Sequence, residues 1–133
     1  MPSTNKTENI YGTGLEKGPA NYAPLSPINF LRRIASVYPN KTAVIYGDLK
    51  FSYGEFFARC RGLAFALQQD GVGSGDTVSV MAPNIPAMLE CHYGVPMVGA
   101  ILNAINTRLD STSIAFILEH SEAKVLIVDQ EYL

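Results

Sequence analysis

A regular alternation between short β-prone runs and longer amphipathic segments constrains the fold of this chain more than any other feature. The runs at residues 77–81, 101–102 and 125–128 are rich in β-branched and aliphatic side chains, and segments with helical spacing lie before and between them. Strands that alternate with helices favour a parallel sheet, because each helix carries the chain back to the same edge. The sequence therefore predicts an α/β fold with a Rossmann-like layer.

An antiparallel β-hairpin is predicted ahead of this layer. Residues 42–46 and 49–53 are β-prone and flank the turn pair Gly47-Asp48. Ser52 and Glu55 then match the S-x-x-E capping box, which predicts a helix start. Gly71 is expected to end that helix in a left-handed conformation. Its predicted buried face comprises Phe56, Phe57, Cys60, Leu63, Ala64 and Leu67, with Arg59, Arg61, Gln68 and Gln69 largely outside it.

Three further helices are predicted from their starts and stops. Ser26 followed by Pro27 starts a helix that Pro39 ends. Asn84 is expected to cap a second helix, which Gly94 and Pro96 interrupt or bend. Asp110 or Ser111 caps a third. The apolar positions of these helices are Ile28, Leu31, Ile34 and Ala35, then Met88, Leu89 and Cys91, then Ile114, Ile117 and Leu118.

The two ends of the chain carry separate expectations. Residues 1–25 lack periodicity and are predicted to form a flexible N-terminal arm, with the folded part at 26–133. Residues 125–128 contain no polar side chain, as expected of a parallel strand that is covered on both faces. The helix after this strand has barely begun at Leu133. We therefore expect a fragment that is truncated before a catalytic core is complete.

Composition and charge exclude several classes of function. Ten basic and twelve acidic side chains give a net charge of −2, so nucleic acid is not an expected partner. The basic pair Arg32-Arg33 is interpreted as a solvated helix face. No apolar run is long enough for a signal peptide core or a membrane span. Cys60 and Cys91 have no metal-ligand spacing and indicate buried thiols, so we expect a cytoplasmic protein.

Several local patterns are candidate sites. The loop 71–76 is rich in glycine, but it follows a helix and opens a strand, whereas a phosphate loop has the reverse order. Cys91-His92 places a thiol beside an imidazole, yet neighbouring helical side chains point about 100° apart. His120 is interpreted as a charge near a helix C-terminus. The carboxylates Asp48, Asp76 and Asp110 are interpreted as turn or cap residues. No residue is therefore assigned a catalytic, cofactor-binding or metal-binding role.

Five short motifs nevertheless occur in one order along about 115 residues. They are Phe51-Ser52-Tyr53-Gly54-Glu55-Phe56, the segment from Gly71 to Val78, Pro83-Asn84, the segment from Val98 to Asn106, and Ser121-Glu122-Ala123-Lys124-Val125-Leu126.

In this order and spacing, the chain resembles the N-terminal portion of the adenylate-forming acyl-CoA synthetases, the AMP-dependent synthetase/ligase superfamily. Pro19-Ala20-Asn21-Tyr22 and Pro24-Leu25-Ser26-Pro27 resemble more narrowly the plant acyl-activating enzymes and related bacterial short- and medium-chain acyl-CoA ligases. The resemblance implies a reaction in which a carboxylic acid and ATP form an acyl-adenylate and the acyl group then passes to coenzyme A. It assigns 26–133 to the N-terminal part of that domain.

The same resemblance implies ATP, Mg²⁺ and CoA as cofactors of the full-length family. The family's phosphate loop, its Tyr/Thr/Glu segment near magnesium, its ribose-binding Asp and its C-terminal Lys have no match here, so no site residue is carried over. Two hypotheses follow. The chain is an inactive piece of an acid–CoA ligase that needs the remainder of the ligase, or it is a non-catalytic interaction module for a related synthetase. A peroxisomal location would require a C-terminal signal in the parent gene.

Overall fold

The fold is that of a computed structural model, which describes Gly14 and residues 16–133. Most of the predicted arm, residues 1–13 and 15, lies outside the described residues. The elements are α1 (Pro27–Val37), β1 (Thr42–Tyr46), β2 (Leu49–Ser52), α2 (Tyr53–Gln69), β3 (Thr77–Met81), α3 (Pro86–Met97), β4 (Ile101–Ala104), α4 (Ser111–His120), β5 (Ala123–Val128) and a 3-10 turn (Gln130–Tyr132).

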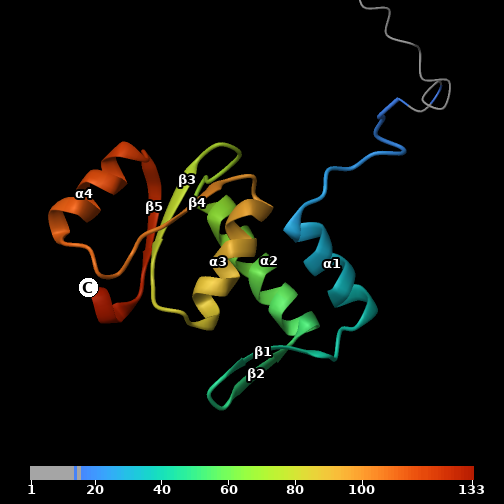
Figure 1. Cartoon of the computed structure of the whole chain (residues 1–133), viewed down its shortest axis with the longest axis horizontal. Coiled ribbons are helices and arrows are strands. Elements are labelled where there is room, and N and C mark those ends of the chain that lie inside the picture. Colours follow the sequence, from blue (N-terminus) through green and yellow to red (C-terminus); the bar gives the residue numbers. More distant parts are fainter. Residues whose placement is uncertain (1–13, 15) are drawn as a thin grey trace, which may run out of the picture.

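The strands form two separate sheets, and both were predicted. β1 and β2 pair as an antiparallel hairpin, whereas β4, β3 and β5 form a parallel sheet in that order. Helices α2 and α3 lie on one side of the parallel sheet and α4 lies on the other (Figure 1). The α/β fold with an early hairpin is therefore confirmed.

The main core lies between the parallel sheet and the helices α2 and α3. Val78 and Val80 point from the central strand into this core, where they meet Cys91 and Val95 of α3. The intervening Ser79 is fully buried on the opposite face. There its hydroxyl accepts a hydrogen bond from Asn103 Nδ2 at 3.0 Å, so the polar side chain has a partner.

A second core joins the hairpin and α1 to the helix pair. Leu31, Phe56 and Cys60 are its buried members. α2 and α3 approach closely because Gly94 has no side chain: a Cβ there would lie 2.8 Å from Leu63 Cδ2 and 3.0 Å from the Cys60 carbonyl oxygen. This contact fixes the predicted α2 face against α3.

Local capping signals account for most of the helix ends. The Ser52 and Glu55 capping box is present, and the side chains of Ser26 and Asp110 accept hydrogen bonds at the starts of α1 and α4. α2 ends in a Schellman motif with Gly71 at φ +77°, in which the Val72 amide donates to the Leu67 carbonyl at 2.9 Å. These four predictions are confirmed.

The structure departs from the sequence predictions at three points. Asn84 does not cap α3, because Pro86 occupies the first helical position and makes Ile85 the N-cap residue. Of the two effects predicted for Gly94 and Pro96, interruption does not occur, because α3 continues to Met97 and Pro96 lies in its last turn. β5 is covered only in part within the described residues, since Leu126 is 45% exposed.

Candidate functional site

The glycine-rich loop 71–76 is a turn, as predicted. The Asp76 carboxylate closes the loop. It accepts a hydrogen bond from the Gly73 amide at 2.8 Å and forms an ion pair with Lys124 Nζ at 2.9 Å. Both bonds hold the pKa of Asp76 below its ordinary value, and the bond from Lys124 has the larger effect. Lys124 Nζ also donates to the Gly71 carbonyl at 2.7 Å, so the loop is tied to β5.

Cys91 and His92 do not form a catalytic pair. Cys91 is buried in the main core, whereas His92 is exposed and its Nδ1 lies 2.8 Å from the Met88 carbonyl oxygen in the preceding turn. Burial raises the pKa of the Cys91 thiol to about 11 and that of Cys60 to about 12. Both cysteines are therefore core residues with unreactive thiols, as the sequence indicated.

The remaining candidates also have structural roles. Asp110 Oδ1 accepts from the Ser113 amide at 3.0 Å, and its second oxygen accepts from the Ser113 hydroxyl. His120 lies in the last turn of α4 and stacks on Phe116 at 5.4 Å. Asp48 lies in the hairpin turn. In the described part of the chain, no three His, Cys, Asp or Glu side chains gather as metal ligands. Nor is any described helix both long and apolar enough to span a membrane.

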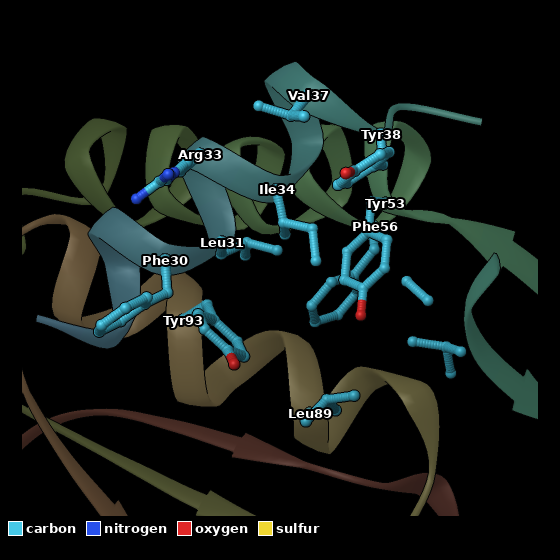
Figure 2. A pocket seen from close by; sticks show the side chains of 12 residues that line it. Phe30, Leu31, Arg33, Ile34, Val37, Tyr38, Tyr53, Phe56, Leu89 and Tyr93 are labelled. Atoms are coloured by element: carbon cyan, nitrogen blue, oxygen red, sulfur yellow. The ribbon is translucent and has the colours of Figure 1, made fainter. Parts of the chain in front are cut away.

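An apolar hollow lies beside the hairpin. This hollow of about 570 Å³ separates α1, β1 and α3, and its lining combines aromatic and aliphatic side chains with one charged residue, Arg33. Figure 2 shows Tyr93, Phe56, Tyr53 and Leu89 around this hollow, below α1. Phe56 and Tyr93 meet edge to face at 5.5 Å and so fix the wall between α2 and α3.

A second hollow of about 300 Å³ lies along β1. Val44 and Leu89 line both hollows, so the two lie side by side, and together we call them the hairpin groove. The groove contains no nucleophile with an adjacent base, and its chemistry is that of a binding surface. Sequence reasoning missed it. The sequence signal was in and just after α1, where Phe30, Val37 and Tyr38 lie off the predicted buried face.

This arrangement of a parallel α/β layer with an attached hairpin belongs to the N-terminal domains of adenylate-forming ligases. A fatty acyl-CoA synthetase of Mycobacterium tuberculosis superposes on 79% of the chain with a TM-score of 0.76 and 31% identity, and the match covers 21% of that structure. The chain belongs to the AMP-binding enzyme family, which matches residues 31–133.

Two curated relatives of this chain are acid–CoA ligases of plants. The peroxisomal acetate/butyrate–CoA ligase AAE7 of Arabidopsis thaliana is 49% identical over 118 residues, or 89% of this chain. The peroxisomal trans-cinnamate:CoA ligase of Petunia hybrida is 52% identical over 119 residues, or 90% of this chain. The matched region is 21% of each relative, so the chain spans about a fifth of their length.

Proposed function

We propose that the chain is the N-terminal part of the AMP-binding domain of an ATP-dependent carboxylic acid–CoA ligase. The observation that carries this proposal is the family match over residues 31–133 together with two acid–CoA ligases at about half identity. In the whole ligase, an acyl-adenylate would form from the acid and ATP, and the acyl group would then pass to CoA. The contribution of this chain is architectural, because its described side chains serve caps, turns and cores.

We infer that the chain has no ligase activity by itself. Adenylate formation depends on groups that position ATP and stabilise the charge on its phosphates. Here the loop 71–76 is closed by Asp76 and Lys124, and the two thiols are buried. ATP, Mg²⁺ and CoA would be bound by the ligase outside residues 1–133.

The class of substrate follows from the relatives only as far as a carboxylic acid. The Arabidopsis relative is named for aliphatic acids and the petunia relative for an aromatic acid. Because both are about 50% identical to this chain, similarity to them does not distinguish the two kinds of acid. Both names also say peroxisomal, which supports a peroxisomal ligase over the cytoplasmic location expected from the sequence. Imaging of the tagged full-length gene product distinguishes the two compartments.

A chimeric enzyme tests the proposed function. The matching segment of the petunia trans-cinnamate:CoA ligase is replaced by this chain, and acid-dependent pyrophosphate release is measured. We expect activity from the chimera and none above a no-enzyme blank from the isolated chain. A folded chimera that binds ATP but releases no pyrophosphate would contradict the proposal, and so would release by the isolated chain.

The hairpin groove favours a second candidate, a non-catalytic module that binds a related synthetase. Stable accumulation of the 133-residue chain in cells, with the synthetase recovered on it, would support this alternative.

A further inference from the structure

The rim of the hairpin groove is unusually apolar for a surface left to water. Phe30 and Val37 of α1 and Tyr38 at its C-cap line the larger hollow and are 60%, 56% and 58% exposed. Ile45 of β1, which lines the smaller hollow, is 67% exposed. Single exposed apolar side chains are common, but a continuous apolar surface around a hollow marks a contact site. A small molecule in the hollow would leave these rim side chains in water. An occupant that covers both the rim and the hollow must be a polypeptide.

The charge on the groove restricts the chemistry of that polypeptide. Arg33 is the one cationic side chain that lines the larger hollow, and no carboxylate lines it among the described residues. In the part of the chain that the structure describes, Arg33 makes no ion pair, and Arg59 and Lys124 make the two that occur. Figure 2 shows Arg33 on α1 at the edge of the hollow, with its guanidinium directed away from the aromatic side chains. An acidic side chain on the occupant would complement it.

We propose that, in the assembled ligase, the hairpin groove is covered by an apolar segment from outside residues 1–133 that carries an acidic side chain facing Arg33. This inference rests on the proposed function, since it takes the occupant from the ligase itself. The curated relatives provide the length required, because the region matched by this chain is 21% of each. The segment places apolar side chains between α1 and β1, against Leu89 and Tyr93.

Engineered cysteines test the proposal, because both native thiols are buried with raised pKa values and react slowly with a thiol reagent. Val37→Cys places a thiol on the groove rim. Phe65→Cys is the matched control, since Phe65 is 63% exposed on α2 and lines neither hollow. Each is introduced into the petunia chimera and into the isolated chain, and labelling at each site is followed by peptide mass spectrometry.

In the chimera, we expect Cys at position 37 to be labelled at least about tenfold more slowly than Cys at position 65. In the isolated chain, both should be labelled rapidly while the native Cys60 and Cys91 stay unlabelled, which verifies that the chain is folded. Equal rates in a folded chimera would overturn the proposal. Slow labelling at position 37 in the isolated chain would overturn it as well, because another part of this chain or a second copy would then occupy the groove.

Substitutions of two neighbouring arginines test the acidic side chain proposed for the covering segment. Arg33→Glu in the chimera should raise the labelling rate at position 37 several-fold, whereas Arg32→Glu, outside the lining, should not. No difference between the two variants would remove the acidic side chain from the proposal. These readouts do not depend on catalysis. A chimera that is protected at position 37 but inactive would support this inference and contradict the proposed function. An active chimera with rapid labelling at position 37 would support the proposed function and contradict this inference.

Discussion

Arg59 of α2 and Glu90 of α3 form a two-point ion pair across the helix interface. Arg59 Nε lies 2.5 Å from Glu90 Oε1, and Arg59 Nη2 donates to Oε2 at 3.3 Å. This hydrogen bonding raises the pKa of the Arg59 guanidinium above its usual value. The guanidinium also lies 4.8 Å from the Phe51 ring centroid, so one side chain connects β2, α2 and α3. Glu90 is buried, and Arg59 supplies the charge that makes this burial tolerable.

Removal of this arginine should destabilise the chain. Arg59→Leu leaves the Glu90 carboxylate buried without its partner, and we expect a loss of about 1 to 2 kcal/mol in the free energy of unfolding. This is less than for a fully buried pair, since Arg59 is about half exposed. Arg61→Leu, on the same helix but in no described ion pair, is the control. Denaturant melts measure both, and an Arg59→Leu midpoint equal to that of Arg61→Leu would show that the pair contributes nothing.

Two glycines in or against α2 should respond oppositely to alanine. Gly94→Ala places a methyl group 2.8 Å from Leu63 Cδ2, so we expect a loss of about 1 to 3 kcal/mol from overpacking. Gly62 has open space around its Cβ position, and Gly62→Ala should stabilise the helix by about 0.5 to 1 kcal/mol. Thermal melts of the two variants check the signs. A neutral Gly94→Ala would mean that α2 and α3 separate easily.

The cap and the apolar face of α2 can be compared directly. Ser52→Ala removes the side chain that accepts from the Glu55 amide at 3.2 Å, at an expected cost of about 1 kcal/mol. Leu63→Ala should cost more, about 2 kcal/mol, at the low end for a core leucine because Leu63 is half-buried. If urea melts make Leu63→Ala the milder change, the packing of α2 against α3 contributes less than its cap.

The predictions that succeeded depend on signals within a few residues. The capping box of Ser52 and Glu55 and the left-handed Gly71 depend only on nearby backbone, so the sequence contains them completely. Asn84 was a reasonable cap by composition. It failed because Pro86, two residues later, restricts where the first helical turn can begin.

The features that were missed depend on residues far apart in the chain. Arg59 and Glu90 are 31 positions apart, so the helical pattern placed Arg59 outside the apolar face without revealing its partner. The hairpin groove likewise forms between α1, β1 and α3, and no single segment predicts a hollow. The cover on β5 was expected from its continuous apolar run, but whether an edge strand is covered depends on tertiary neighbours.

Acid should weaken the junction between the loop 71–76 and β5. The folded pKa of Asp76 is below the ordinary aspartate value of 3.8, first because of its hydrogen bond to Lys124 and then because of the Gly73 amide. Its stabilising contribution is therefore fully present above pH 3.8 and is lost as the pH falls through the folded pKa. Asp76→Asn should flatten the fall in urea midpoint between about pH 5 and pH 2.

The exposed apolar surface of β5 and α4 should make the isolated chain self-associate. Phe116 is 63% exposed and Leu126 is 45% exposed, and β5 is an edge strand with free backbone groups. Apolar surface beside a free strand edge promotes dye binding and self-association. We therefore expect the chain to bind a hydrophobic dye and to associate as its concentration rises. Leu126→Thr should reduce both effects, since it keeps strand propensity while removing apolar surface.

Leu49→Thr is the matched control, because Leu49 is a similarly exposed leucine at 54% that lies on the hairpin. Sedimentation and dye fluorescence of the three proteins separate a local effect from a general one. Equal reductions by Leu126→Thr and Leu49→Thr would assign the association to overall hydrophobicity. A monodisperse chain with a sharp thermal transition and no dye binding would mean that the α4 and β5 face is stable in water, which would favour an independent binding module over a part of a larger ligase.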